Sequence, residues 1–359
     1  MKHIVGLTGA LTFVASIAHA GALERGKPPG STILFETGDL VEFSIRAVSP
    51  TVSGVSSTSV SSGDVTHGYT QMGLAFRQEM SPKFTAALVF DQSYGANTKY
   101  LTSAFPLAGT KATAQTNSIT LLGKYQLDRN FSIFGGPRMQ TFNAQASIPG
   151  IGGYTATTET DTGFGYVIGA AYEIPEIKLR ASLTYSSEVT HRNPTVETGP
   201  APGSSVSTTT LPQSLSLDFQ SGIAKDTLAF GGVHWVNWDG FAISPAGYVA
   251  TTGGPLVSYS DDRFYYTAGV GRRFNETWSG AVTVGYEPSV GGISPNLSPI
   301  DGLASLGLGL TYKSGDMKIS GGASYIWLGD ANTNVAGPIT GAFRDNSAIA
   351  MGLKFSFQL

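Results

Sequence analysis

Few residues of this chain are spaced for catalysis. The five histidines stand at positions 3, 19, 67, 191 and 234, and no two of them have the spacing of a metal-binding pair. A serine hydrolase needs a histidine beside a serine and an orienting polar residue, and His191 and His234 are the conceivable candidates. Serine is so frequent here that any histidine has one nearby. Because cysteine is also absent, we expect no enzyme, no metal site and no cofactor.

Arginine side chains offer a different chemistry, the recognition of a carboxylate through charge-assisted hydrogen bonds. Several arginines fall on the water-facing side of the strands predicted below, and four are candidates to contact a ligand head group: Arg77, Arg138, Arg180 and Arg263. Arg273 shares their phase. Each could instead pair with an acid in the same interior, such as Glu42 or Glu188, so both interpretations stay open.

Extended segments must position these side chains, and the C-terminus shows their type most clearly. From Ile349 to Leu359 every odd-numbered residue is apolar, whereas the even-numbered positions carry alanine, glycine, lysine, serine and glutamine. A period of two indicates a strand with one apolar and one polar face. An apolar face that continues to the last residue would be an exposed edge in a soluble protein, but a barrel surrounded by lipid requires it.

The composition fits such a barrel. The mean hydropathy of +0.03 is typical of a chain in which lipid-facing and water-facing residues alternate. Beyond residue 20, no apolar run reaches the roughly 18 residues that a transmembrane helix needs. The slight excess of acidic over basic residues argues against nucleic acid as a partner.

Residues 1–20 have the pattern of a secretory signal peptide. Lys2 and His3 precede an apolar run from Ile4 to Ile17, and residues 18–20 (Ala-His-Ala) form a small-residue cleavage site. The mature chain would therefore begin near Gly21, on the exported side of the inner membrane.

Alternating segments recur from residue 39 onward and predict an all-β protein, a transmembrane antiparallel β-barrel of about fourteen strands. Each segment is close to the roughly 9–11 residues that a tilted strand needs to cross the hydrocarbon. They lie at about 39–48, 69–79, 84–92, 117–127, 131–145, 163–174, 178–190, 211–221, 227–238, 263–274, 277–287, 301–312, 317–328 and 349–359.

Short turns alternate with long polar loops, which lie at about 49–67, 93–116, 146–162, 191–210, 239–262, 288–300 and 329–346. In such barrels the short turns face the periplasm and the long loops face outward, so we expect both termini in the periplasm. Residues 21–38 precede the first strand without a clear period. They form either a tail or a short plug segment in the lumen, and residues 39–359 form the barrel.

Three stretches go beyond the general barrel pattern: Leu211 to Trp238, Asp262 to Trp278 and Tyr185 to His191. Together with the signal peptide and the closing strand, they resemble the FadL/TodX family of outer-membrane transporters for long-chain fatty acids and other hydrophobic compounds. The resemblance implies a fourteen-stranded barrel with an N-terminal hatch, which would include Leu34, Phe35 and Glu36. It also implies capture of the ligand between external loops, an inner pocket and sideways release through the barrel wall.

The chain departs from this family in its hatch. The Asn-Pro-Ala tripeptide that is common there has no match, and the nearest counterpart is Phe-Glu-Thr-Gly at residues 35–38. The leading segment is also shorter than usual for the family.

Two predicted external loops contain apolar residues that turn formation does not require. We propose them as the capture groove: Ile148, Ile151 and Tyr154 in one loop, and Val196, Pro200 and Val206 in the other. They could instead pack the loops on each other. Trp235 and Trp238 end a predicted strand on the outer side, where an interfacial aromatic girdle is expected.

The resulting hypothesis is a monomer in the bacterial outer membrane, in contact with membrane lipid, that takes up hydrophobic compounds passively. Fatty acids are the most plausible ligands. Two alternatives stay open: a general diffusion porin for small hydrophilic solutes, with an open lumen lined by facing charges, and a structural or adhesive barrel with ordered polar loops.

Overall fold

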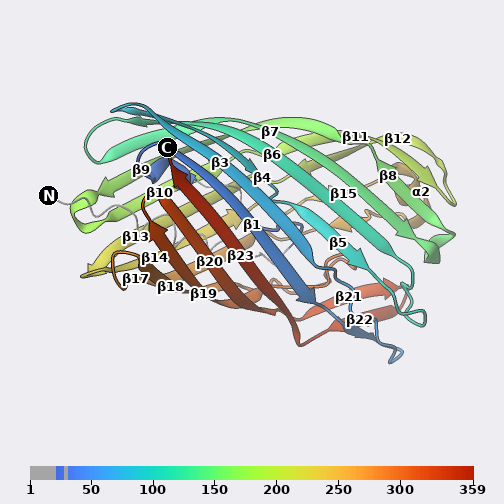
Figure 1. The fold of residues 1–359 in the computed structure, drawn as a ribbon. Coiled ribbons are helices and arrows are strands. Elements are labelled where there is room, and N and C mark those ends of the chain that lie inside the picture. The colour runs from blue at the N-terminus through green and yellow to red at the C-terminus, as the bar shows by residue number, and fades with distance from the viewer. Residues whose placement is uncertain (1–21, 28–30) are drawn as a thin grey trace.

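A computed structural model describes residues 22–27 and 31–359 of the chain, so the predicted signal peptide lies outside the described residues. Most of the rest is one antiparallel sheet that closes on itself as a barrel (Figure 1). Closure is direct, because β1 and β23 pair along their whole length, from Leu40 with Gln358 to Thr51 with Ser347.

Within the described residues, eighteen strands form this sheet. Some of them are consecutive pieces of one interrupted strand, so the barrel wall has fourteen strand positions, called lines below. Ten lines are single strands: β1 (Leu40–Thr51), β3 (Tyr69–Ser81), β6 (Lys111–Gln126), β7 (Phe131–Ile148), β14 (Thr227–Val236), β17 (Arg263–Arg273), β18 (Trp278–Glu287), β19 (Leu303–Ser314), β20 (Met317–Leu328) and β23 (Asn346–Gln358). Four lines consist of two consecutive strands: β4 (Phe84–Asp91) with β5 (Gly95–Lys99), β8 (Tyr154–Thr158) with β9 (Asp161–Ile174), β10 (Leu179–Ser186) with β11 (Val189–Thr198), and β12 (Gly203–Leu211) with β13 (Ser214–Ala224). The predicted fourteen-strand barrel is confirmed.

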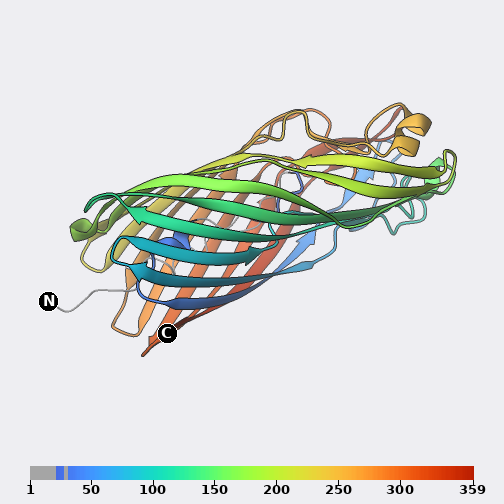
Figure 2. The same ribbon diagram turned by 90° about the horizontal axis from the view of Figure 1, so that it is seen from above.

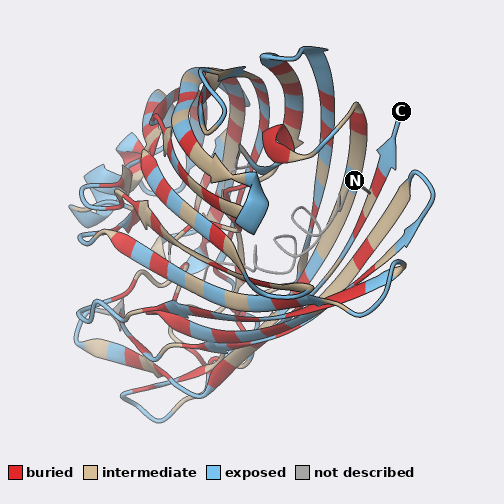
Figure 3. Ribbon diagram, turned by 90° about the vertical axis from the view of Figure 1, so that its left-hand side faces the viewer, coloured by how far each residue is buried: buried red, intermediate tan, exposed pale blue. Residues whose placement is uncertain are grey.

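The two faces of the wall have the predicted polarity. In β23, Ile349, Met351 and Leu353 are exposed on the outside, whereas Lys354 and Ser356 are buried toward the interior. Figure 3 shows the same alternation of buried and exposed residues along strand after strand. Lipid would solvate the outer apolar face, while small polar side chains fill the inside.

Several strands continue beyond the predicted limits on the side of the long loops. β6 begins at Lys111, β7 ends at Ile148, and β8, β11 and β12 lie within segments predicted as loops. Figure 2 shows these long strands running out to the helix α2 (Ala246–Thr252). Threonine is frequent in the extensions and favours strands, but their outer face is polar and therefore lacks the apolar alternation of a membrane strand.

Smaller elements cover this outer end. β2 (Gly54–Ser56), β21 (Ala331–Ala336) and β22 (Ile339–Phe343) form a three-stranded sheet. β15 (Ala242–Ile243) and β16 (Val257–Ser258) flank α2, and the short helix η2 (Pro149–Ile151) follows β7. At the other end, η3 (Pro175–Ile177) forms one of the short turns. Among the described residues, no helix has the length and apolar character needed to cross a membrane.

The described part of the leading segment lies inside the barrel. Its second half forms the short helix η1 (Ser31–Phe35), whose Ile33, Leu34 and Phe35 pack against small and apolar side chains of the wall: Ala75, Ala87, Val89, Leu122, Phe134, Val167 and Ala171. Since these wall residues come from β3, β4, β6, β7 and β9, η1 packs against one side of the interior. The described residues of the leading segment thus lie in the lumen.

Candidate ligand path through the barrel

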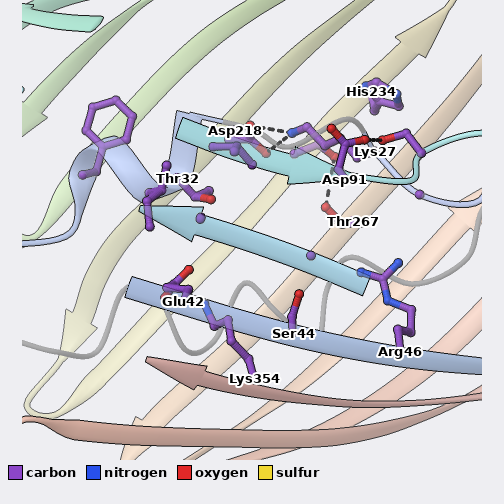
Figure 4. Close-up of a pocket in the computed structure, with 18 of the residues that line it drawn as sticks. Lys27, Thr32, Glu42, Ser44, Arg46, Asp91, Asp218, His234, Thr267 and Lys354 are labelled. Carbon is purple, nitrogen blue, oxygen red and sulfur yellow. Dashed lines mark hydrogen bonds and ion pairs between the residues drawn. The ribbon is translucent and has the colours of Figure 1, made fainter. Parts of the chain in front are cut away.

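A cavity with a volume of about 270 Å³ lies in the middle of the barrel. Figure 4 shows that charged side chains from opposite parts of the wall and from the leading segment converge on it: Lys27, Glu42, Arg46, Asp91, Asp218, His234 and Lys354. Apolar surface comes from Ile33, Phe35, Val89 and Phe230. The cavity therefore offers both ionic and apolar contacts to a small molecule.

Two smaller pockets continue from this cavity toward the outer end. One of about 100 Å³ is bounded by residues 22–25, β1, β5 and residues 297–300, and one of about 40 Å³ lies beneath the loop that carries α2. Leu23, Ala96 and Leu297 line both of them, so the two pockets adjoin. The outermost pocket is walled by small apolar residues, including Ala112, Ala114, Ala144, Phe142 and Leu256.

The leading segment separates the outer pockets from the central cavity. Residues 22–25 line the 100 Å³ pocket, whereas Gly26 and Lys27 line the 270 Å³ cavity. Backbone hydrogen bonds join the segment to the wall, since Arg25 N donates to Ser93 O and Gly95 N donates to Leu23 O, both at 2.8 Å. A ligand that moves inward from the outer pockets must displace or pass this segment.

Two polar side-chain contacts tie the segment to the opposite wall. Lys27 Nζ lies 2.7 and 2.6 Å from the two carboxylate oxygens of Asp218 on β13. Glu24 Oε1 lies 3.0 Å from Nε2 of His234, and the other ring nitrogen lies 2.8 Å from Oγ of Ser216. These three groups have the composition of a hydrolase triad, but all are at most 4% exposed, and the imidazole joins the segment to β13 and β14.

The periplasmic half of the segment is held mainly by Phe35. Its ring packs edge-on against Phe134 at 5.9 Å between centroids, and the cations of Arg180 and Lys124 lie 4.5 and 4.8 Å from its centre. Such cation–π contacts contribute about 0.5–2 kcal/mol each, depending on desolvation. Glu36 completes the attachment through Lys318 Nζ on β20, at 3.3 Å.

One seam of the barrel wall is incomplete next to the central cavity. The ladder between β3 and β4 runs from Ser81 with Phe84 to Leu74 with Phe90, where it ends. Beyond this point side chains replace the ladder, because Gln71 Nε2 donates to the carbonyl oxygen of Gln92 at 2.6 Å and Met72 N donates to Gln92 Oε1 at 2.9 Å.

The cavity reaches this break. Residues 71–75 of one strand and residues 89–93 of the next all line it. On the outer face of the same stretch, Met72 and Leu74 are 51% and 52% exposed. At this position side-chain hydrogen bonds, and not a backbone ladder, join the two strands that lie between the cavity and the outer surface.

The structure places the four predicted head-group arginines on the inner face, but at different depths. Arg77 contacts Glu79 at 2.9 Å near the periplasmic end, and Arg263 contacts Asp301 at 2.7 Å at the outer end. Arg138 has only long hydrogen bonds, to Thr120 and Ser186. Of the four, Arg180 alone lines the central cavity, so they do not form one site.

The predicted groove residues fall into two groups. Ile148 and Tyr154 are buried in a small core, with Ile151 packed against it, and the Tyr154 hydroxyl donates to Glu197 Oε1 at 2.7 Å. Pro200 is exposed beside Gly152. Val196 and Val206 are 54% and 56% exposed on the surface of the β11–β12 hairpin. The two groups do not line a common groove.

The predicted girdle position of Trp238 is wrong. Its ring is fully buried and packs against Tyr94, Phe241 and Tyr259. Trp235 does lie on the outer side, where its Nε1 donates to Asp262 at 2.8 Å. Positions three apart on a strand have opposite faces, so period-two reasoning already prevents both rings from facing lipid.

Sequence reasoning missed the partners of the leading segment and the side chains at the break. Lys27 and Asp218 are 191 positions apart, and Gln71 and Gln92 have no local pattern that marks them. Only the inward phase of Asp218, shared with Ser216 and other buried residues of β13, could have suggested a lumenal role.

Comparisons with known proteins agree with this architecture. A family model described as the outer membrane protein beta-barrel domain matches residues 46–219. No curated protein matches the chain. Among solved structures, a Pseudomonas aeruginosa FadL homologue superimposes with a TM-score of 0.77 at 10% identity, covering 99% of this chain and 98% of that one.

Two toluene transporters are also similar. The P. putida protein TodX has a TM-score of 0.66 at 11% identity, covering 96% of this chain and 99% of its own. The Ralstonia pickettii protein TbuX has a TM-score of 0.67 at 14% identity, with 98% of both chains covered. This chain therefore has the outer-membrane β-barrel fold of the FadL and TodX structures.

Proposed function

We propose that the protein lets hydrophobic compounds diffuse through the bacterial outer membrane. In this proposal a ligand enters the outer apolar pockets, passes the leading segment, occupies the central cavity and leaves sideways into the bilayer between β3 and β4. The observation that carries the proposal is the contact between the 270 Å³ cavity and the interrupted ladder.

The exit follows from the energetics of the wall. Opening a complete ladder inside the hydrocarbon would expose backbone donors and acceptors, each at a cost of several kcal/mol. At the break those backbone bonds are already absent, and rotation of the Gln71 and Gln92 side chains is enough to release the two hydrogen bonds that replace them. The wall can therefore open there without unpairing a strand.

The entrance is supported by the outer pockets and by the similar structures. The 40 Å³ pocket is apolar and lies toward the exterior, where an apolar ligand would first gain from leaving water. Similar structures are described as toluene transporters and a monoaromatic hydrocarbon channel. Long-chain fatty acids, the ligands expected from the sequence, would use the same route with their carboxylate in the charged cavity.

A diffusion porin for hydrophilic solutes is the second candidate, because the central cavity carries charges of both signs. The leading segment argues against it, since its described residues block the connection between the outer pockets and the cavity. We further propose that the barrel is a monomer whose outer apolar surface contacts only membrane lipid.

Uptake by intact cells tests the function. The protein would be produced in a Gram-negative host that lacks such transporters, and uptake of labelled toluene and oleate would be compared with uptake of a hydrophilic sugar. We expect faster uptake of the hydrophobic compounds only, and a small single-channel conductance. A large, steady conductance together with sugar uptake would support the porin instead.

A further inference from the structure

Six cations on the inner side of the barrel are paired with an acid. The structure gives these ion pairs for the described residues: Lys27 with Asp218, Arg77 with Glu79, Arg263 with Asp301, Arg273 with Asp226, Lys318 with Glu36 and Lys354 with Glu42. A buried cation that keeps its charge needs such a partner, because desolvation disfavours the charged form. Cations without an acid partner therefore require another explanation.

Arg25 and Arg46 are two such cations. Among the described residues neither forms an ion pair with a carboxylate, although both are removed from bulk solvent. The Arg25 guanidinium lies 4.2 Å from the centre of the Tyr69 ring, and Arg46 has one long hydrogen bond of 3.5 Å to Gln71 Oε1. Both arginines are therefore left with weak, uncharged partners.

Both arginines lie at the leading segment. Arg46 projects from β1 into the cavity, as Figure 4 shows, and a Cβ added to Gly26 would lie 2.9 Å from its Nη1. Arg25 is the neighbour of Gly26, and Tyr69 interacts electrostatically with both arginines. Two cations held close together without an anion attract one strongly, because the interior screens charge less than water does.

The 100 Å³ pocket next to Arg25 has both charged and apolar walls. Arg25, Tyr69 and Glu24, whose carboxylate faces His234, line this pocket together with the apolar side chains of Val48, Ile326 and Leu328. An engineered cavity of about 150 Å³ binds benzene, so a pocket of this size suits a single ring and not a long alkyl chain. Its shape and charge together specify a compact amphiphile.

We propose that this pocket binds small hydrophobic carboxylates of the benzoate type. The carboxylate contacts Arg25 and is attracted by the charge of Arg46, which lines the central cavity on the other side of the leading segment, and the ring lies against Val48, Ile326 and Leu328. This inference rests on the proposed function and narrows it, because it makes an anionic aromatic compound a better ligand than a neutral hydrocarbon or a long-chain fatty acid.

Calorimetric titration of the purified full-length protein tests the site. Sodium benzoate would be compared with benzyl alcohol, which has a similar shape without charge, and with inorganic phosphate, which has charge without the ring. We expect benzoate to bind at least about tenfold more tightly than either, because charge-assisted hydrogen bonds are stronger than neutral ones.

Variants assign the effect to the two arginines. Arg46→Gln and Arg25→Gln should each weaken benzoate binding about tenfold and leave benzyl alcohol unchanged. Lys83→Gln, which removes the same charge from an exposed turn, is the matched control and should change neither. Arg46→Lys keeps the charge in the same place and should restore part of the affinity if charge is the cause.

Equal binding of benzoate and benzyl alcohol, or of benzoate and phosphate, would overturn the proposed ligand class. Unchanged benzoate binding in Arg46→Gln would overturn the site. In either case, continued toluene uptake by cells would leave the transport function standing. Loss of all hydrophobic uptake by the unmodified protein would instead contradict the proposed function itself.

Discussion

Two seams of the barrel wall differ in how they are held. The seam between β1 and β23 joins strands from the two ends of the barrel domain, and its ladder is complete over all twelve residues of β1. The seam between β3 and β4 joins neighbours in the sequence, yet its ladder ends halfway and two glutamine side chains replace it. The weaker seam is therefore the one that a covalent turn holds together.

This difference shows where a barrel can open without unfolding. No loop links β1 to β23, so only their hydrogen bonds and packing keep the barrel closed there. β3 and β4 remain connected through the turn at Pro82 and Lys83, and six consecutive residue pairs, from Glu79 with Thr85 to Leu74 with Phe90, stay in register. An interruption farther along this hairpin can widen while the barrel stays closed.

The largest expected effect comes from cross-linking the weak seam. The chain has no native cysteine, so Gln71→Cys with Gln92→Cys can be joined selectively by a short thiol-reactive linker. If the ligand leaves here, uptake of toluene should fall to the level of cells without the protein, and reduction of a cleavable linker should restore it.

A matched cross-link in the strong seam provides the control. Ala47 and Met351 are paired across β1 and β23 and both face outward, so a link between cysteines at these positions should not change uptake. Equal loss of uptake from both cross-links would indicate a general distortion of the barrel. Normal uptake through a fully cross-linked weak seam would contradict the lateral exit.

A second large effect is expected from the anchor of the leading segment. Phe35→Ala removes a ring that packs on Phe134 and two cations, and truncation of a buried phenylalanine costs roughly 3–5 kcal/mol. The wall would remain intact, so this loss should release the segment and raise single-channel conductance. Protease cleavage near the N-terminus should become faster.

Phe164→Ala is the matched variant, because Phe164 lies on the outer face and is 73% exposed. It should leave both conductance and cleavage unchanged. If Phe35→Ala raises neither the conductance nor the cleavage rate, the leading segment does not block the lumen. The difference between the two seams alone would then have to explain why hydrophobic compounds pass and hydrophilic solutes do not.

The wall was predictable from the sequence because its pattern is local. The turns at Pro82, Asp128 and Lys225 and the outward phase of β23 follow from alternation and from turn-forming residues over a few positions. The outer extensions were not predictable in the same way. Above the membrane both faces of β11 and β12 carry threonine and serine, so the apolar signal that marks a membrane strand disappears.

The candidate site was less predictable because it depends on distant pairings. The alternation of side chains along the strands identified Arg180 and Arg263 as facing the lumen. That alternation gives neither their depth in the barrel nor their partners. Glu24 and His234 are 210 positions apart and meet only because the leading segment folds back into the barrel. Gln92 bridges the two strands because the β3–β4 ladder ends beside it. The type of residue at position 92 does not predict where a ladder ends.

A moderate effect is expected from the side chains at the break. Gln92→Ala removes the acceptor of Met72 N and its own bond to Asn117, so the weak seam should open more often and uptake should rise a few-fold. One lost hydrogen bond corresponds to about 1 kcal/mol, or roughly a fivefold change in an equilibrium.

Gln140→Ala serves as the comparison. Gln140 is a buried glutamine with a side-chain hydrogen bond of 3.0 Å to Ser118, but it lies where β7 is paired with both neighbours. Its loss should destabilise the barrel slightly without increasing uptake. A similar rise in both variants would mean that general loosening, and not the break, limits uptake.

The smallest expected effect is a pH dependence of the leading segment's attachment near the strong seam. Burial alone raises the pKa of Glu36, but Lys318 and Lys354 outweigh burial and hold that pKa below its ordinary value. A carboxylate whose pKa is lowered by folding stabilises the folded state fully at pH values above its unfolded pKa of about 4.3. This stabilisation is lost as the pH falls through the lower pKa of the folded state. Single-channel conductance should therefore rise slightly below about pH 4.

Glu36→Gln removes the titrating group and should abolish this pH dependence, with conductance at neutral pH similar to that of the unmodified protein in acid. Lys318 is on β20 and Lys354 is on β23, so this contact holds the segment to the permanently closed side of the wall. If acid instead increased lateral uptake without changing conductance, the segment would be coupled to the weak seam. The division of the wall into a fixed side and an opening side would then be wrong.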